Sequence, residues 1–158
     1  MVKKSNLVII RDTREQKPLV FPNAKVKDAK LQTGDYSLEH FEDKITIERK
    51  SLSDLLQSLS AERKRFMSEV QRMRAFEYAG LVVEASLADI YRGVWRNAIS
   101  VGSVVGSLQA LSAKHGLHVL FACDRAIAAL MVEGILYHFL RKQHDHWERI
   151  KNLLGGIT

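Results

Sequence analysis

Glu48 and Lys50 lie in a segment, residues 45–50, in which apolar and polar side chains alternate. Such alternation is typical of a half-buried strand, on which every second side chain faces the same way. We therefore expect Glu48 and Lys50 to share one face and Arg49 to lie on the other. A carboxylate beside an ammonium at a strand end can hold a metal ion and a water. It can equally form a surface ion pair that stabilises little.

Carboxylates are concentrated in the first third of the chain. The candidates for a shared site are Asp12, Glu15, Asp35, Glu48 and Asp54. Two or three carboxylates that meet at one point bind Mg²⁺ or Mn²⁺, which are hard cations that prefer oxygen ligands. A nearby lysine can orient or activate an attacking water, and the ion can stabilise the charge of a phosphoryl transition state. An acid followed by Glu-x-Lys is common by chance, so the spacing alone is weak evidence.

A buried strand is predicted just before the first of these acids. Residues 7–10 form a continuous apolar run, as in strands that are covered on both faces, and the polar residues 11–15 follow at once. Sites in α/β folds commonly lie where a strand ends. The same residues could instead form a solvated loop, and the sequence here supports both interpretations.

A hairpin would bring Asp35 towards Glu48. Gly34 and Asp35 mark a turn into a strand over residues 36–40, which would pair with the Glu48 strand. Asp35 would then lie across the hairpin from Glu48 or Lys50. Its alternative role is that of a turn former.

The remainder of the chain alternates helices with strands. Helices are predicted over residues 51–60, 61–78, 87–91, 100–115 and from Asp124 onward, and strands over 80–85 and 117–121. The expected fold is α/β, with a mixed β-sheet and helices on both of its faces. We expect residues 1–142 to form one domain and residues 143–158 to form a C-terminal tail of mixed composition.

Composition limits the class of protein. The chain has 158 residues, 46% of them hydrophobic, and a single cysteine, which excludes a disulfide framework. Cys123 lies in an apolar run and is expected to be a small core residue in a reducing compartment. No apolar run approaches the roughly 20 residues of a membrane span, and we read the N-terminus as a strand and not as a signal peptide.

Positive charge is in moderate excess. The formal net charge is +6 at pH 7, which suits a polyanionic partner. The basic residues of the helix predicted over 61–78 are Arg63, Lys64, Arg65, Arg72 and Arg74. This helix could contact phosphates, or its basic face could simply be solvated. In a later loop, Trp95 and Arg96 could stack on DNA, with packing as the alternative for Trp95.

Three short motifs together resemble a known family. GDY at 34–36 and IERKSLSDL at 47–55 resemble the G-D…E-R-K-x-x-x-D signature of the XPF-type structure-specific endonucleases, and DTRE at 12–15 resembles their D-x-R-E element. The resemblance covers residues 6 to about 140. It implies the restriction-endonuclease-like fold, a mixed β-sheet flanked by helices.

The resemblance also implies roles for the acidic and basic residues. Asp35 and Glu48 would bind Mg²⁺ or Mn²⁺, and Asp12 would be a third ligand, directly or through water. Lys50 would position the attacking water. Arg49 would be required for activity and would hold one of the two remaining catalytic carboxylates, Glu15 or Asp54.

DNA contacts follow from the same resemblance. They would come from Arg14, Arg63, Lys64 and Arg65, of which Arg63 matches the arginine that follows the E-R-K helix in relatives. The implied function is a metal-dependent DNA endonuclease for branched or flap-type DNA, acting in DNA repair inside the cell, in the cytoplasm or at the nucleoid. The alternative is a non-catalytic DNA-binding or dimer-partner subunit of a nuclease complex.

The sequence departs from the family in one respect. Members usually append a tandem helix-hairpin-helix module that grips DNA and dimerises, and the sequence to Thr158 contains none. Branch specificity and the source of such a module therefore stay open. Family nuclease domains often pair with a like domain, so we expect a homodimer or a partner subunit. The last helix and the helix with Gly102 and Gly106 are the candidate surfaces, and packing inside the chain is the alternative.

Overall fold

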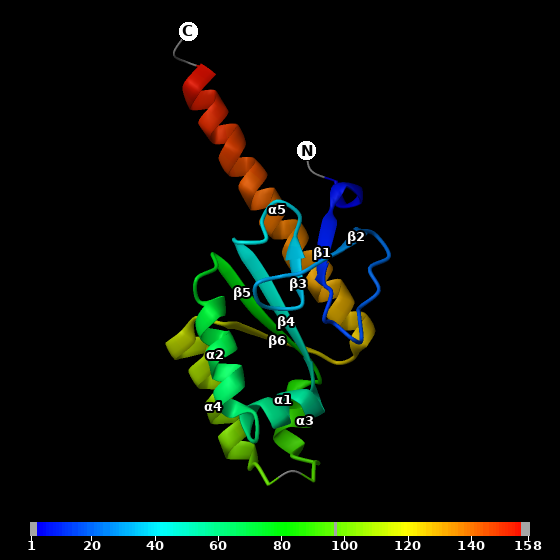
Figure 1. Cartoon of the computed structure of the whole chain (residues 1–158), viewed down its shortest axis with the longest axis vertical. Helices are drawn as coiled ribbons and strands as arrows, with labels where there is room; N and C mark the ends of the chain where they lie inside the picture. The colour runs from blue at the N-terminus through cyan, green and yellow to red at the C-terminus, as the bar shows by residue number, and fades with distance from the viewer. Residues whose placement is uncertain (1–2, 97, 156–158) are drawn as a thin grey trace.

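One mixed sheet runs through the molecule. The computed structural model describes residues 3–96 and 98–155, and within these ranges the strands form a single six-stranded sheet (Figure 1). The strands are β1 (Val8–Asp12), β2 (Lys25–Ala29), β3 (Tyr36–Leu38), β4 (Ile45–Ser51), β5 (Tyr78–Glu84) and β6 (His118–Ala122), in the order β2-β1-β3-β4-β5-β6. Only β3 runs antiparallel to its neighbours, and the remaining pairs are parallel. The predicted mixed α/β fold and the 36–40/45–50 hairpin are confirmed.

Helices cover both faces of this sheet. They are the 3₁₀ helix η1 (Lys4–Asn6) and the α-helices α1 (Leu52–Leu59), α2 (Arg63–Met73), α3 (Leu87–Arg92), α4 (Val101–His115) and α5 (Arg125–Gly155). The long helix α5 crosses strands β3 to β6 and projects beyond the body of the molecule towards the C-terminus (Figure 1). Helices α1 and α4 contact strands of the sheet, and α2 and α3 pack against α4. No helix in the described ranges combines the length and apolarity needed to cross a bilayer.

Alternating residues of the central strands supply two separate cores. Ile45 and Ile47 of β4 pack in the core under α5, which also contains Leu136 of that helix. Leu81 and Val83 of β5 pack in the other core, with α1, α2 and α4. Because side chains alternate along a strand, the α1/α2 face of β4 receives its even-numbered residues and the α5 face its odd-numbered ones. This separation places Arg49 opposite Glu48 and Lys50, as predicted.

Several predictions about the later elements were wrong or incomplete. Helix α2 ends at Met73 and β5 begins at Tyr78, so Glu77 belongs to neither. Cys123 is exposed, because it follows β6 at the edge of the sheet before α5 begins. A Cβ added to Gly102 or Gly106 would meet no atom within 4 Å, so neither glycine serves close packing inside the chain.

Helix α5 passes through the expected domain boundary without a break. It continues to Gly155, since the segment after residue 142 contains helix-favouring residues and no proline. The mixed tail is therefore helical as far as it is described, and residues 156–158 lie outside the described ranges. The division at residue 142 stays a prediction.

Candidate active site

A polar cleft opens where β4 passes directly into α1. Its lining consists of Arg14, Glu15, Gln16, Lys17, Asp35, Glu48, Arg49, Lys50, Asp54, Gln57, Ser58, Glu62 and Arg65. The junction is short because Ser51 ends the strand and caps the helix, with its hydroxyl accepting a hydrogen bond from the Asp54 amide at 3.2 Å. The strand end and the helix start therefore share one edge of the sheet.

The main chain of Asp35 is bound on both sides. Its amide donates to the Ile47 carbonyl of β4 at 2.9 Å, and its carbonyl accepts from the Asp12 amide of β1 at 2.8 Å. Gly34 has φ +77°, and a Cβ there would collide with the Thr46 hydroxyl. The glycine thus permits the close approach that brings Asp35 to the β4 edge. The Asp35 side chain accepts a hydrogen bond from the Arg49 amide at 2.8 Å.

Glu48 and Lys50 form a pair on the α1/α2 face of β4. Lys50 Nζ donates to Glu48 Oε1 at 2.8 Å and lies 5.0 Å from the centre of the Phe66 ring of α2. The side chains are 12% and 9% exposed for Lys50 and Glu48, so this is not the solvated ion pair that the sequence left open. Burial lowers the pKa of Lys50, but the Glu48 carboxylate outweighs it and raises the pKa overall, which keeps the ammonium charged.

The two carboxyl groups of the cleft have raised pKa values. Burial raises the pKa of Asp35 to about 7. Burial, and then repulsion from Asp35, raises the pKa of Glu48 to about 8. Glu15 also contributes to the raised pKa of Asp35, and the effect of Asp35 on Glu48 means that these two groups lie within electrostatic reach of each other. A divalent cation bound between two such carboxyls would offset their repulsion and favour their ionised forms.

The oxygen atoms of this pair fit Mg²⁺ or Mn²⁺. Asp35 Oδ2 and Glu48 Oε1 are taken by hydrogen bonds, while in the described part of the chain Asp35 Oδ1 and Glu48 Oε2 accept none. Mg²⁺ is commonly bound by one or two carboxylates, with waters and substrate phosphates completing its octahedron. Among the described residues, no group of three or more His, Cys, Asp or Glu could hold a metal. Asp35 and Glu48 therefore offer a donor set that suits such an ion, and Asp12 as a third contributor, directly or through water, stays a prediction.

Asp12 does not join the other two carboxylates. It accepts hydrogen bonds from Arg14 Nε at 2.7 Å, Arg14 Nη2 at 2.9 Å, the Arg14 amide at 2.8 Å and the Leu31 amide at 2.7 Å. Burial would raise its pKa, but these bonds outweigh it and lower the pKa below its usual value. With its oxygens engaged in these hydrogen bonds, Asp12 holds Arg14 and the loop before β3.

Arg49 is clamped on the opposite face of β4. Its guanidinium donates to Glu15 at 3.1–3.2 Å and to Glu84 Oε1 at 3.0 Å. The Arg49 and Glu15 side chains are only 6% and 4% exposed. Of the two partners expected for Arg49, the structure therefore selects Glu15, whereas Asp54 bonds to the Ser51 hydroxyl at the rim of the cleft.

The basic residues of α2 point in different directions. Arg65 lines the cleft, where its 84% exposed side chain pairs with Glu62 at 3.3 Å. Arg63 turns towards α4 and donates to the Ser107 hydroxyl at 3.2 Å, and Lys64 is exposed. Arg65 is thus better placed than Arg63 to meet a phosphate at the cleft. Trp95 donates its Nε1 hydrogen to the Ile99 carbonyl at 2.9 Å and packs in the α1/α2 core, which supports the packing role.

Three charged residues near the site were missed by sequence reasoning. Glu69 of α2 lies close enough to raise the pKa of both Glu48 and Lys50. Glu84 ends β5, directly beside Ser51 at the end of β4, and it binds Arg49. Arg125 begins α5 and donates to Glu84 at 3.3 Å. The position of Glu84 could have been predicted, because the ends of neighbouring parallel strands meet at one sheet edge.

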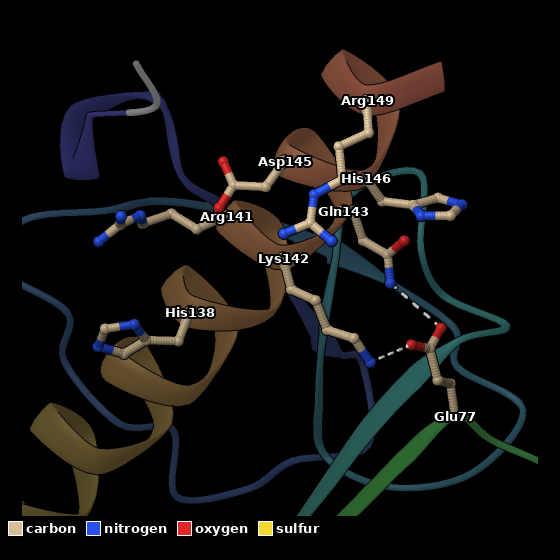
Figure 2. Close-up of a pocket in the computed structure, with 8 residues that line it drawn as sticks. All are labelled: Glu77, His138, Arg141, Lys142, Gln143, Asp145, His146 and Arg149. Atoms are coloured by element: carbon tan, nitrogen blue, oxygen red, sulfur yellow. Dashed lines mark hydrogen bonds and ion pairs between the residues drawn. The ribbon is translucent and has the colours of Figure 1, made fainter. Parts of the chain in front are cut away.

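A second hollow lies elsewhere, along α5. It is lined by Glu77, His138, Arg141, Lys142, Gln143, Asp145, His146 and Arg149 (Figure 2). Lys142 and Gln143 donate to the two Glu77 oxygens at 2.7 and 3.1 Å. None of the residues predicted to be catalytic lines this hollow. It lies where β5 begins, whereas the cleft lies at the end of the sheet where β4 and β5 finish.

The raised pKa values predict how pH changes the stability of the metal-free protein. The folded-state pKa values of Asp35 and Glu48 lie above those of the unfolded chain. Their stabilising effect is therefore complete below about pH 4 and is lost as pH rises through about 7 to 8. We expect thermal unfolding in EDTA to show a melting temperature that is several degrees lower at pH 8.5 than at pH 5.5, since ~1 kcal/mol shifts it by about 2–4 °C in a domain of this size.

Two controls distinguish this cause from a general effect of pH. Asp35→Asn removes one charge of the pair, so its melting temperature should fall less over the same pH range. Mg²⁺ or Mn²⁺ should raise the melting temperature of the unmodified protein more at pH 8.5 than at pH 5.5. Equal pH dependence of Asp35→Asn and the unmodified protein would contradict the assignment.

Comparison with known proteins identifies relatives of this arrangement. The family model described as the ERCC4 domain matches residues 11–145. Among solved structures, XPF from Aeropyrum pernix is similar with a TM-score of 0.67 and 24% identity, over 82% of this chain and 59% of that one. XPF from Aeropyrum pernix in complex with DNA is similar with a TM-score of 0.68 and 25% identity, over 87% of this chain and 66% of that one. This chain spans less than two thirds of either, and no curated protein matches it.

Proposed function

Because this chain belongs to the ERCC4 domain family and has the fold of an XPF-type nuclease domain, we propose that it is a Mg²⁺- or Mn²⁺-dependent DNA endonuclease. One observation carries the proposal. Two buried carboxyls with raised pKa values, Asp35 and Glu48, share a polar cleft with the charged Lys50. Perturbed groups that gather in a cleft are typical of catalytic sites.

The proposed mechanism gives each side chain one task. Asp35 and Glu48 would hold the ion through the two oxygens that accept no hydrogen bond in the described chain. When bound, the ion supplies Lewis-acid stabilisation of a phosphate and lowers the pKa of a water. Lys50, fixed by Glu48 and lying near the Phe66 ring, would orient the water that attacks the phosphodiester. Arg49 would act in two ways: its guanidinium binds Glu15 on the other face of β4, and its main-chain amide donates a hydrogen bond to the Asp35 carboxylate.

DNA is the proposed substrate. The solved XPF structure in complex with DNA belongs to a protein that is 25% identical to this chain, and the net charge of +6 suits a polyanion. Arg65 and Arg14, which line the cleft, would contact phosphate there, and the exposed Lys64 and Arg63 of α2 would contact the backbone outside it. We propose branched or flap-type DNA as the preferred form and DNA repair inside the cell, in the cytoplasm or at the nucleoid, as the setting.

A nuclease assay tests the proposal. Labelled flap, fork and plain duplex DNA would be incubated with the protein in Mg²⁺, in Mn²⁺ and in EDTA. Cleavage that needs the ion and favours a branched form supports the endonuclease. Tight binding with no cleavage in either ion supports the alternative, a DNA-binding subunit. The buried Glu48–Lys50 pair favours the enzyme, since a subunit that only binds DNA has no need of two destabilised carboxyls.

A second copy of the chain or a partner subunit would pack on α5. Exposed apolar side chains include Ile127 and Leu130 on this helix, at 38% and 53% exposure, and Val20 at 81% in the loop between β1 and β2, which lines a hollow together with Leu130. Exposed apolar residues that are grouped in this way are typical of protein interfaces. Sedimentation at micromolar concentration would test self-association, and a monomer at all concentrations would favour a different partner.

A further inference from the structure

Charged contacts join helix α5 to both ends of strand β5. Near one end, Arg125 of α5 donates to Glu84, the last residue of β5. Near the other, Lys142 and Gln143 donate to Glu77, just before β5 begins (Figure 2). The helix and the strand have matching lengths between these contacts. The 17 residues of helix from Arg125 to Lys142 span about 25 Å, and the 7 residues from Glu77 to Glu84 span about 23 Å. Only the Arg125 end lies at the edge of the sheet that holds the cleft.

Arg125 contacts both sides of the Arg49 clamp, which consists of Arg49 and the two carboxylates that bind it, Glu15 and Glu84. Its Nη1 donates to Glu84 Oε1, the same oxygen that Arg49 binds. Its Nη2 donates to the carbonyls of Lys17 and Pro18, in the loop that follows Glu15. The Lys17 amide in turn donates to Glu15 Oε1 at 2.7 Å. One guanidinium therefore joins both carboxylates that hold Arg49, one directly and the other through its loop.

The four charges of this network balance. Arg49 and Arg125 carry two positive charges, and Glu15 and Glu84 carry two negative ones. Without Arg125, Glu84 would have only Arg49 to neutralise it, and Arg49 would be drawn away from Glu15. The loop of Glu15 would also lose its contact with α5. A planar fork is needed to reach a carboxylate and two carbonyls at once, and a lysine offers only a point charge.

We infer that Glu84 and Arg125 are positioning residues of the nuclease site, which hold Arg49 and the Glu15 loop and, through them, the orientation of Asp35. The inference rests on the proposed function and adds to it two residues outside the recognised motifs. Arg49 connects the network to the cleft through its amide, which donates to Asp35 Oδ2 at 2.8 Å. Loss of a group that orients a metal ligand without touching the metal typically lowers metal affinity or activity by about 10–100-fold.

The two places where α5 makes charged contacts beside β5 supply a matched experiment. Arg125→Ala and Lys142→Ala each remove one cationic contact between α5 and β5, but only Arg125 contacts the Arg49 clamp. The full chain and both variants would be compared by kcat and KM on cleaved DNA, by direct Mn²⁺ titration without DNA, and by thermal unfolding. Arg125→Lys is added as the conservative variant.

We expect Arg125→Ala to lower kcat, or weaken Mn²⁺ binding, by about tenfold, with KM for DNA changed less than twofold. Lys142→Ala should stay within twofold of the unmodified protein in kcat, KM and Mn²⁺ affinity, although it loses the ion pair with Glu77. Arg125→Lys should recover part of the loss, because it keeps the charge beside Glu84 and loses the fork.

Two results would be unfavourable, and they are distinguishable. If the unmodified chain cuts DNA and Arg125→Ala behaves like Lys142→Ala, the positioning role is wrong while the nuclease stands. If the unmodified chain neither cuts nor binds Mn²⁺, the proposed function is wrong, and the positioning role with it.

Discussion

Asp35→Asn should reduce DNA cleavage by about 10³-fold or more while leaving the fold intact. The amide is the same size as the carboxylate and can still accept the hydrogen bond from the Arg49 amide. It cannot supply the charge that a divalent ion requires, and loss of the several kcal/mol contributed by a bound ion corresponds to a factor of this size. The measurement is kcat/KM on a labelled branched substrate in Mg²⁺, with circular dichroism to confirm the fold.

A matched control for this variant lies on the edge strand of the same sheet. Asp28 of β2 pairs with Arg11 in an exposed contact, and β1 and β3 separate its strand from β4. Asp28→Asn makes the same chemical change and should leave cleavage unaltered. The role of Asp35 is refuted if both variants cut as fast as the unmodified protein.

Arg49→Met should destabilise the protein by about 3–5 kcal/mol. Methionine fills much of the same volume, but it leaves the Glu15 carboxylate, which is 4% exposed, without its cation, and leaves Glu84, which is 14% exposed, with Arg125 alone. Urea denaturation would measure the loss as a shift in the midpoint. Arg11→Met, which removes an arginine from a carboxylate pair that is more exposed, should cost no more than ~1 kcal/mol.

A combined variant separates two causes of that loss. In Arg49→Met with Glu15→Gln and Glu84→Gln, no uncompensated carboxylate remains. If the cost comes from unpaired buried charge, this variant should recover much of the lost stability, as replacement of whole buried ion pairs often does. A triple variant that is less stable than Arg49→Met alone would instead assign the cost to the shape of the guanidinium.

Local patterns in the sequence were sufficient for the strand at the centre of the site. Alternation over residues 45–50 assigned Glu48 and Lys50 to one face and Arg49 to the other, and the structure agrees. The turn at Gly34 and the start of a helix after the strand were likewise visible, because each depends on residues within a few positions. Contacts of this range follow from backbone geometry.

Local patterns did not reveal Glu84 and Arg125. Glu84 is 35 residues away from Arg49, and Arg125 is a further 41 residues along the chain. Only the parallel pairing of β4 with β5 and the path of α5 across the sheet bring them together. Asp12 shows the converse case, since it matches a motif but its oxygens are occupied by Arg14 and Leu31.

The central claim is that Asp35 and Glu48 together bind a catalytic divalent ion. Mn²⁺ titration of the metal-free chain at pH 8, followed by electron paramagnetic resonance, tests it most directly. We predict that one ion binds to the unmodified protein, and that Asp35→Asn and Glu48→Gln each weaken this binding at least tenfold while Asp28→Asn does not. Binding of equal strength in all four proteins, or no binding in any, would contradict the claim.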